Sequence, residues 1–371
     1  MHQLSFDSMS SPAVKPIGFG SVQEIALPEG VSAFPQLRYM GSKYRLLPWI
    51  HSVLSQFPFQ TALDAFSGSG CVSYLLKKMG KQVYGNDFLN FSHQISAATI
   101  ENSITTLDHN ELSLLLEPNR NRKQFIQRTF NGIFYTPQDL RFLDNTWANL
   151  VLLPSKAHRS LTMAALTRAC VKKQPRGVFT ITGNLERYDD GRRDLKLSLS
   201  ELFIESVQAY NQVVFSNGME NKSFVGDIFE LKPNFFDLVY LDPPYVPQAD
   251  DNCYIKRYHF VEGLASYWKE AGTEIMFETA SKKIAKRFTP FSYKKTSIDA
   301  FKRIFQQFSQ STIVLSYSSN GYPDLQTLVT ILKQHKSKCE VFEKPHRYHF
   351  GTHPSVSPAR ASVQEYLIVG Y

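Results

Sequence analysis

Apolar and polar positions between residues 61 and 85 follow the pattern of a strand, then a helix, then a second strand. Residues 61–66 (TALDAF) form a short apolar run that ends at the Gly-rich turn SGSG, and residues 71–79 (CVSYLLKKM) have apolar side chains at helical spacing. Gly80 ends that helix, and residues 81–85 (KQVYG) begin another strand. This order predicts a βαβ unit with parallel strands and a right-handed crossover.

Three later apolar runs predict further strands of the same sheet. Residues 237–241 (DLVYL) have the pattern of a buried strand and lead directly into Asp242-Pro243-Pro244-Tyr245, where two prolines end the strand because neither can donate to a β-ladder. Residues 312–317 (TIVLSY) stop before Asn320-Gly321, and residues 364–370 (QEYLIVG) predict a final strand. Together these runs predict an α/β fold.

The pattern changes between about residues 88 and 221. This segment is mostly helical in periodicity, rich in Lys and Arg, and interrupted by Gly177 and Gly183. Around residues 171–182, Val178, Thr180 and Thr182 alternate after the sequence QPRG, which favours a basic hairpin. We interpret the segment as an insertion into the α/β sheet.

The composition fits a folded protein without covalent cross-links. A chain of 371 residues with 43% hydrophobic and 13% aromatic residues has enough apolar side chains for a sizeable core, which excludes global disorder. The four cysteines are scattered without CxxC spacing, which argues for a reducing compartment and against a zinc site or a disulfide scaffold. They are Cys71, Cys170, Cys253 and Cys339.

The sequence contains no recognisable membrane span or signal peptide. No apolar run approaches the roughly 20 residues that cross a bilayer, and residues 1–30 lack a basic start followed by an apolar block. We therefore expect residues 1–33 to be a flexible leader, and the protein to be soluble and intracellular.

The net charge of +8 is moderate but unevenly distributed. Residues 120–200 hold fifteen Lys and Arg against six Asp and Glu, an excess of nine positive charges, so the rest of the chain is close to neutral. A local basic excess is typical of a surface that binds a phosphate backbone, but a solvated helical surface has the same composition. Charge alone leaves both interpretations open.

The Gly-rich turn at residues 66–70 (FSGSG) has the position of a ligand-binding loop. Ligands of open α/β sheets bind where strands end and helices begin, and Gly68 and Gly70 would let a ligand approach the backbone. Asp87 lies about twenty residues further on, after the second strand, where an acid typically bonds ribose hydroxyls. A helix N-cap is the alternative role for Asp87. Because full GxGxxG spacing is lacking, the two features favour a single nucleoside over a dinucleotide.

The tetrapeptide Asp242-Pro243-Pro244-Tyr245 carries the strongest chemical indication. The amine of adenine is a poor nucleophile because its lone pair is delocalised into the ring. The Asp242 carboxylate and the Pro243 carbonyl would both accept from this amine, localise the lone pair and orient it for attack. The prolines would make the loop rigid, and Tyr245 offers a face on which an extruded base can stack. A turn that merely contains two prolines is the alternative.

These motifs, in this order, resemble the Dam-like (D12 class) family of DNA adenine-N6 methyltransferases over about residues 37–371. Residues 37–44 (LRYMGSKY) are similar to its N-terminal signature, residues 64–70 (DAFSGSG) to its cofactor loop, and residues 226–229 (GDIF) to the segment that lines the cofactor's adenine. Residues 166–180 (LTRACVKKQPRGVFT) resemble the stretch that ends in its DNA-reading hairpin.

The chain departs from the family pattern at a few positions. It has Asp64 where the family usually has Glu, and Ala65 where the family usually has Pro. After the catalytic motif the family tends to carry a Phe followed by an Asp-His pair, whereas residues 260–264 here are FVEGL. The role of that pair is therefore in doubt for this chain.

The resemblance implies a Rossmann-like class I methyltransferase sheet with an inserted, mostly helical target-recognition domain. Residues 34–90 would be the cofactor-binding part of the catalytic domain, residues 91–220 the target-recognition insert, and residues 221–371 the catalytic part. It also implies S-adenosylmethionine as methyl donor and no metal. The residues expected to bind this cofactor are Tyr39, Lys43, Asp64, Phe66, Gly68, Gly70, Asp87, Asp227 and Asp242.

The implied catalytic group consists of Asp242, Pro243, Pro244 and Tyr245, with the carboxylate and the first proline's carbonyl holding the adenine amine. The implied partner is double-stranded DNA. The residues expected to contact it are Arg168, Lys172, Lys173 and Arg176.

We therefore expect a site-specific DNA adenine methyltransferase that acts on a flipped-out adenine. We expect it to be the modification component of a restriction-modification system, with a cognate restriction endonuclease as functional partner, in the cytoplasm of a prokaryote or a phage-infected cell and associated with the nucleoid. One alternative is a methyltransferase acting on RNA adenine or on protein glutamine, although glutamine-modifying relatives tend to begin the motif with Asn. The other is a non-catalytic DNA-binding protein on the same fold.

Two RYHF segments, residues 257–260 and 347–350, interleave basic and aromatic residues. Phosphate contacts are one hypothesis for them, and packing is the favoured one. Cys253 with His259 makes only a weak metal-binding pair.

Overall fold

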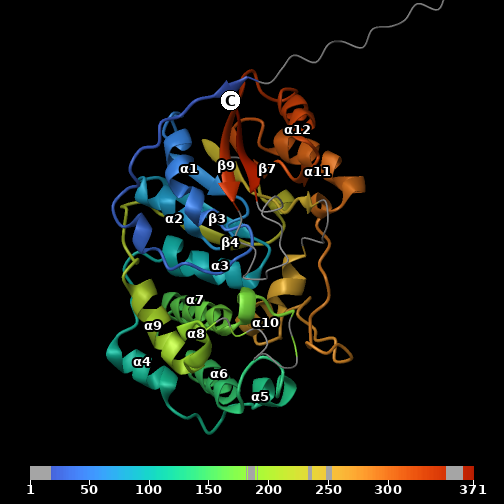
Figure 1. The fold of residues 1–371 in the computed structure, drawn as a ribbon. Coiled ribbons are helices and arrows are strands. Elements are labelled where there is room, and N and C mark those ends of the chain that lie inside the picture. The colour runs from blue at the N-terminus through green and yellow to red at the C-terminus, as the bar shows by residue number, and fades with distance from the viewer. Residues whose placement is uncertain are drawn as a thin grey trace, which may run out of the picture.

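The computed structural model describes residues 18–180, 182, 189, 191–232, 236–247, 253–347 and 362–371 (Figure 1). In these residues one mixed sheet of eight strands has the order β1-β9-β10-β7-β5-β2-β3-β4. The strands are β1 Phe19–Gly20, β2 Thr61–Asp64, β3 Gln82–Asp87, β4 Lys222–Val225, β5 Leu238–Leu241, β7 Thr312–Ser318, β9 Cys339–Arg347 and β10 Ser362–Gly370. A separate two-stranded sheet pairs β6 Val246–Pro247 with β8 Gly321–Tyr322.

The sheet is parallel except around β10, which runs antiparallel to both β7 and β9. From β2 the chain builds β3 and β4 on one side and later β5 and β7 on the other, all parallel to their neighbours. The order of strands therefore reverses between β2 and β5. In open α/β sheets, ligands bind at the carboxyl ends of the strands at such a reversal.

Helices cover both faces of the sheet because successive residues of a strand point to opposite sides. Leu238 and Tyr240 of β5 join a core that includes α1 and α2, whereas Val239 and Leu241 join a core formed with α11 and α12. The helices are α1 Leu47–Leu54, α2 Cys71–Lys78, α3 Asn90–Ser96, α4 His109–Leu116, α5 Phe125–Thr129, α6 Pro137–Leu150, α7 Lys156–Lys173, α8 Arg193–Lys196, α9 Leu199–Asn211, α10 Tyr254–Ser266, α11 Lys294–Gln307 and α12 Leu325–Leu332.

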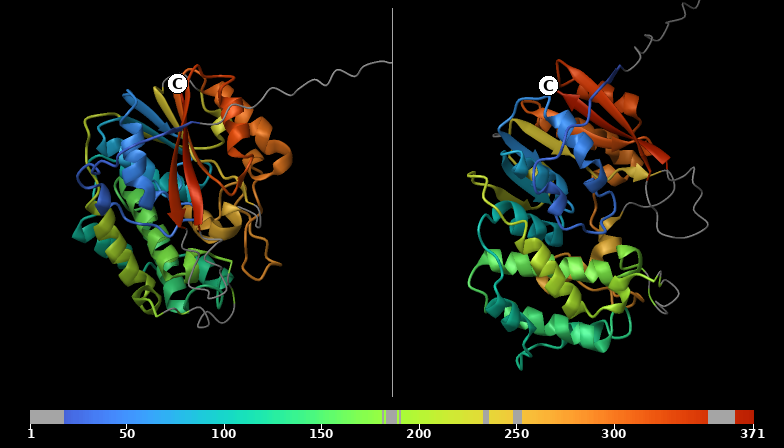
Figure 2. Two further views of the ribbon diagram at one scale, coloured as in Figure 1. Left: turned by 45° about the horizontal axis from the view of Figure 1, so that its top comes forward. Right: turned by 60° about the vertical axis from the view of Figure 1, so that its left-hand side comes forward.

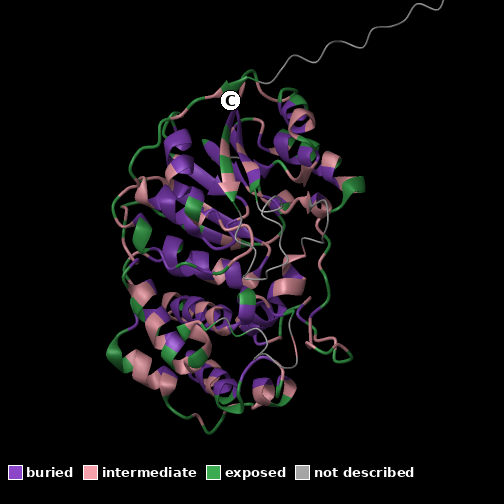
Figure 3. Ribbon diagram, in the orientation of Figure 1, coloured by how far each residue is buried: buried purple, intermediate pink, exposed green. Residues whose placement is uncertain are grey.

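Helices α4 to α9 form a layer of their own on one side of the sheet domain, as the three views of Figures 1 and 2 agree. Helix α7 is central to this layer, since it packs against α9 on one side and α3 on the other. Figure 3 shows α7 largely buried, in keeping with a run of buried residues from Ser160 to Thr167. A helix buried on most sides needs no single apolar face.

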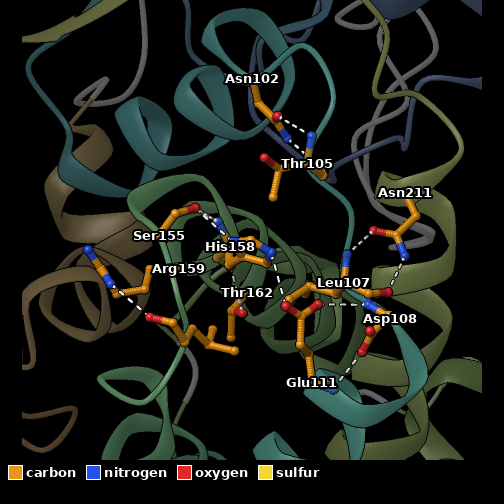
Figure 4. Close-up of polar contacts among 11 residues, drawn as sticks. Asn102, Thr105, Leu107, Asp108, Glu111, Ser155, His158, Arg159, Thr162 and Asn211 are labelled. Atoms are coloured by element: carbon orange, nitrogen blue, oxygen red, sulfur yellow. Dashed lines mark hydrogen bonds and ion pairs between the residues drawn. The ribbon is translucent and has the colours of Figure 1, made fainter.

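Paired hydrogen bonds fix the chain where it enters the helical layer (Figure 4). The backbone of Leu107 exchanges two hydrogen bonds with the Asn211 amide, at 3.0 and 2.8 Å. His158 joins α7 to α4, because its Nε2 lies 3.0 Å from Glu111 Oε1 and its Nδ1 lies 2.7 Å from Ser155 Oγ. The position of the layer is therefore set by specific polar contacts as well as by apolar packing.

The structure confirms the predicted α/β sheet and the strands and helix expected at residues 61–85, 237–241, 312–317 and 364–370. The predicted hairpin around residues 171–182 is wrong where the structure describes it. Residues 171–173 are the last turn of α7, and Pro175–Gly177 form a short 3-10 helix. Phe179 is buried and packs against α10, where its N–H donates to the Arg257 carbonyl at 2.8 Å. Within residues 178–180 the buried residue is thus Phe179, whereas none of the alternating residues Val178, Thr180 and Thr182 is buried, and residues 181 and 183–188 lie outside the described residues.

None of the helices in the described residues is long and apolar enough to cross a membrane.

Candidate active site

A pocket opens at the carboxyl ends of β2, β3 and β5, where the order of strands reverses. Each of these strands places one acidic residue in the pocket. Asp64 ends β2, Asp87 ends β3 and Asp242 directly follows β5. The predicted site residues that line the pocket are Tyr39, Lys43, Asp64, Phe66, Gly68, Asp87, Asp242 and Pro244. The topology therefore brings together motifs that are far apart in the sequence.

The Gly-rich turn can adopt its shape only with glycine. Gly68 has φ +49°, and an added Cβ would lie 2.8 Å from Cε1 of Tyr39. Gly70 has φ +80° and precedes the first turn of α2. Both positions lie in the left-handed region that favours glycine. The turn is thereby folded closely against Tyr39.

Asp87 fastens the turn to the end of β3. Its Oδ2 accepts a hydrogen bond from the Gly68 N–H at 2.8 Å, and its Oδ1 accepts one from the Leu89 N–H at 2.9 Å. Burial raises the pKa of Asp87 to about 6, although these backbone N–H groups favour the charged form. Asp87 therefore orders the loop in addition to lining the pocket.

Asp64 lies deeper and is almost fully buried. Ser73 Oγ of α2 donates to its Oδ2 at 2.6 Å. Burial raises the pKa of Asp64 to about 7, and the negative charges of Asp242 and Asp87 add to the increase. Three acids thus share one pocket, which favours a ligand that brings positive charge.

Lys43 provides the counter-charge for Asp242. Its Nζ lies 3.3 Å from Asp242 Oδ1 and 3.4 Å from Oε2 of Glu365, a residue of β10. Lys43 and Glu365 are buried, whereas the Asp242 side chain keeps 20% of its surface exposed. Burial raises the pKa of Asp242 to about 6; Lys43 opposes this increase and Glu365 adds to it. Our sequence analysis missed Glu365, because nothing in the local pattern of β10 indicates which strand it will lie beside.

The loop Asp242-Pro243-Pro244-Tyr245 is fixed at its C-terminal end by strand pairing. Val246 pairs with Tyr322, so the residue after Tyr245 is anchored to the turn that follows β7. The Tyr245 ring lies 5.2 Å from the Tyr317 ring at the end of β7. Tyr245 is half-buried and does not line the pocket itself. Its ring therefore packs against the end of β7, outside the pocket lining and three residues after Asp242.

An aromatic stack closes the other side of the pocket. The Tyr39 ring stacks on Tyr258 of α10 at 5.1 Å and lies 5.4 Å from Tyr254. Tyr258 Oη accepts a hydrogen bond from the Met40 N–H at 2.7 Å. Helix α10 thus holds the N-terminal motif in place.

The first RYHF segment lies in α10, and its Tyr258, His259 and Phe260 are buried, which confirms the packing interpretation for those residues. His259 Nε2 lies 2.9 Å from the Phe179 carbonyl oxygen. In the second segment only Arg347 is among the described residues. No group of three or more His, Cys, Asp or Glu side chains that could hold a metal occurs in the part of the chain that the structure describes.

Glu262 stands where the family tends to carry an Asp-His pair. It is fully buried, accepts from Asn90 Nδ2 at 3.1 Å and lies 3.3 Å from Arg287 Nη2. Arg287 Nη1 also donates to the carbonyl of Phe88, a pocket residue, at 2.8 Å. The Glu262–Arg287 pair therefore braces the turn that directly follows Asp87.

Asp227 lies away from the pocket lining. It is exposed, and its side chain accepts from the Phe229 N–H at 3.0 Å, which caps the short helix Ile228–Glu230. Its assignment to the cofactor stays a prediction.

Residues expected to contact DNA have partners within the protein. Lys172 Nζ lies 3.2 Å from Asp194 Oδ1, and Lys173 Nζ lies 3.5 Å from Asp139 Oδ2. Arg168 donates to the Gln36 carbonyl at 3.3 Å and to Ser206 Oγ at 3.1 Å. Arg176 is exposed and has φ +59°. Lys172 and Lys173 thus join parts of the helical layer, and Arg168 also joins this layer to the N-terminal segment at Gln36. Contact of these residues with DNA stays a prediction.

Comparison with known proteins places the chain in a family. The model of the family described as D12 class N6 adenine-specific DNA methyltransferase matches residues 39–318. The Type II methyltransferase M2.HphI of Haemophilus parahaemolyticus is 27% identical over 330 residues, which cover 85% of this chain and 92% of that protein.

Two longer relatives match about as much of the chain. The Type II methyltransferase M.FokI of Planomicrobium okeanokoites is 26% identical over 349 residues, and the modification methylase StsI of Streptococcus sanguinis is 25% identical over 324 residues. These matches cover 85% and 80% of this chain but only 50% and 46% of the two relatives. Because the family match extends over most of the chain and includes both the Gly-rich turn and the tetrapeptide at residues 242–245, the chain belongs to the D12 class N6 adenine-specific DNA methyltransferase family.

Proposed function

We propose that this chain transfers a methyl group from S-adenosylmethionine to N6 of an adenine extruded from double-stranded DNA. The observation that carries the proposal is the position of Asp242. Its partly exposed carboxylate follows the strand at the sheet's reversal point, 3.3 Å from Lys43 and in the same pocket as Asp64 and Asp87. Substrate and cofactor would therefore meet at one edge of the sheet.

The charges of the pocket residues complement those of this cofactor. S-adenosylmethionine carries positive charge on its sulfonium and its ammonium, and Asp64, Asp87 and Asp242 all have raised pKa values that a bound cation would lower. Asp87 would hold the ribose hydroxyls, and Phe66 and Tyr39 would contact the rest of the nucleoside. When bound, S-adenosylmethionine supplies an activated methyl group.

The chain's own residues would orient the acceptor. The Asp242 carboxylate and the Pro243 carbonyl would accept hydrogen bonds from the two N–H bonds of the adenine amine and localise its lone pair. Lys43 keeps Asp242 in its charged form, which is the form that accepts. Tyr245 would stack on the extruded base outside the pocket.

We further propose that the chain is the modification component of a restriction-modification system, with a cognate restriction endonuclease as its functional partner. The support is that the relatives at 24% to 27% identity bear the names of Type II or modification methylases. Such an enzyme would work on the chromosome in the cytoplasm. Expression of the chain in a host followed by methylation-sensitive sequencing tests this role, and methylation spread over unrelated sequence contexts would contradict it.

The test of the reaction is a competition between acceptors. The purified chain is incubated with a tritiated methyl donor and a mixture of duplex DNA, RNA and protein, and the label in each pool is counted. We expect label in DNA, and we expect Asp242→Ala to abolish it while DNA binding persists. Label in RNA or protein with none in DNA would overturn the proposal, as would a wild-type protein that binds DNA without methylating it.

A further inference from the structure

The segment of residues 279–295, between α10 and α11, has an unusual charge pattern. It holds six cationic residues and no Asp or Glu. They are Lys282, Lys283, Lys286, Arg287, Lys294 and Lys295. Figure 1 shows this part of the chain running along the side of the molecule between α10 and α11. A run of positive charge without a single acid is the electrostatic pattern of a phosphate-binding surface.

Exposed aromatic rings lie among these charges. Phe288 and Tyr293 are 67% and 47% exposed, and their rings stack on each other at 5.3 Å with an interplanar angle of 18°. Phe277, just before the segment, is 59% exposed. Large aromatic side chains exposed together mark an interaction surface, and aromatic rings interleaved with cations are typical of nucleic-acid contacts.

The middle of the segment is anchored at the rim of the active-site pocket. Arg287 donates to the Phe88 carbonyl at 2.8 Å, and the Phe291 ring lies 5.6 Å from the Phe66 ring. Both Phe88 and Phe66 line the pocket. Phe288 lies between these two anchors in the sequence, so the exposed stack is held close to the site.

The C-terminal end of the segment contacts β8, which pairs with the strand that follows residues 242–245. Lys294 Nζ lies 5.6 Å from the centre of the Tyr322 ring, and Tyr322 pairs with Val246. Lys294 and Lys295 are both exposed. Residues 287–294 therefore extend from the pocket rim to β8, whose Tyr322 pairs with the residue after Tyr245.

We propose that the exposed cations and the Phe288–Tyr293 stack of residues 279–295 bind the backbone of the duplex beside the extruded adenine. This inference rests on the proposed function and extends it to a second DNA-contacting surface. Duplex DNA is the occupant that fits, because its phosphates complement the exposed cations of this segment and because the segment extends from the pocket rim to a strand that pairs with the residue after Tyr245. In the helical layer, Lys172 and Lys173 are paired with acids. The exposed cations at the pocket rim are therefore better placed to contact the backbone of the duplex.

The test is the double variant Lys294→Gln with Lys295→Gln, compared with the wild type. Each lost phosphate contact lowers the slope of log Kd against log salt concentration by about 0.9. We expect the slope to fall by about 1 to 2 and the Kd for a duplex oligonucleotide to rise roughly tenfold at moderate salt. The single-turnover rate at saturating DNA should stay close to that of the wild type, because neither lysine touches the reacting groups.

A matched control removes the same charge elsewhere. Lys333 and Lys338 are exposed and flank the turn before β9, at the amino end of the parallel strands and thus at the opposite edge of the sheet. Lys333→Gln with Lys338→Gln should leave both slope and Kd nearly unchanged. An equal effect in the two double variants would mean that only net charge matters, which would overturn the proposal, and so would an unchanged Kd in the first.

The substitutions at Lys294 and Lys295 should leave the stability of the fold unchanged. Lys294 and Lys295 lie in the first turn of α11, where positive charge opposes the helix dipole, so glutamine there should not weaken the helix. Phe288→Ala provides a second variant of an exposed side chain, and it should weaken duplex binding at unchanged thermal stability. Tight binding of an unrelated protein, with duplex binding unaffected by all of these changes, would contradict the proposal. Failure of the proposed function would instead appear as a wild-type protein that labels no DNA.

Discussion

Lys43 lies between two acids, Asp242 and Glu365, and this arrangement predicts how activity depends on pH. The perturbation is Glu365→Gln, which removes one negative charge from beside Asp242 and keeps the shape of the side chain. The two acidic oxygens lie 3.3 and 3.4 Å from Lys43 Nζ, so they are at most about 6.7 Å apart. At an effective dielectric constant of about 20, two unit charges at that separation repel by roughly 2.5 kcal/mol.

One pKa unit corresponds to about 1.4 kcal/mol, so the repulsion is equivalent to almost two units in a fully buried pair. Because the Asp242 side chain is 20% exposed, we expect solvent to screen part of it and the shift to be about one unit. Burial and Glu365 together raise the pKa of Asp242 to about 6, and removing Glu365 should therefore lower it. The charged form, which accepts from the adenine amine, would then persist to lower pH.

The assay is single-turnover methylation of a duplex oligonucleotide, followed between pH 4.5 and 8 with a tritiated methyl donor. The acidic inflection of the wild type should lie near pH 6, and that of Glu365→Gln about one pH unit lower. Lys43→Met is the control of opposite sign, since loss of the cation should raise the pKa of Asp242 and move the inflection upward. An inflection that stays in place in both variants, or moves in the same direction in both, would refute the assignment of this limb to Asp242.

Three further changes test the packing around the site. Gly68→Ala places a Cβ at φ +49° and 2.8 Å from Tyr39 Cε1, so we expect the free energy of unfolding in urea to fall by about 1–3 kcal/mol and calorimetry to show weaker cofactor binding; unchanged values would mean that the turn can rearrange. Glu262→Ala leaves Arg287 and the start of α3 without a buried acceptor, so unfolding in urea should need about 2–4 kcal/mol less, and a loss under 1 kcal/mol would show that the pair contributes little. Gly263→Ala gains about 1 kcal/mol of helix propensity, but the new Cβ overlaps the Trp268 indole, so a net loss of about 1–3 kcal/mol is expected, and a rise in the melting temperature would count against this packing.

The sequence was most informative where structure is local. The strand at residues 61–66, the Gly-rich turn and α2 follow from the spacing of apolar residues and glycines within about twenty positions, and the structure has them as expected. The meeting of Asp64, Asp87 and Asp242 in one pocket also follows, because consecutive parallel strands present their carboxyl ends at the same edge.

What the sequence did not reveal depends on contacts between distant segments. Glu365 and Lys43 are 322 positions apart, and they meet only because β10 runs antiparallel beside β7. Lys172 belongs to a basic stretch by sequence, yet α8 and α9 supply Asp194 and Glu205 as its partners. A count of charges along the chain cannot distinguish a paired cation from an exposed one, so the exposure of Lys294 and Lys295 follows only from the structure.

The central claim is that Asp242 holds the amine of an adenine in duplex DNA. Its most direct test is mass spectrometry of nucleosides from a duplex treated with S-adenosylmethionine and either the wild type or Asp242→Asn. We predict N6-methyladenine with the wild type, and none above background with the variant although it still binds the duplex. N6-methyladenine formed at comparable rates by both proteins, or methylation of cytosine in place of adenine by the wild type, would contradict the claim.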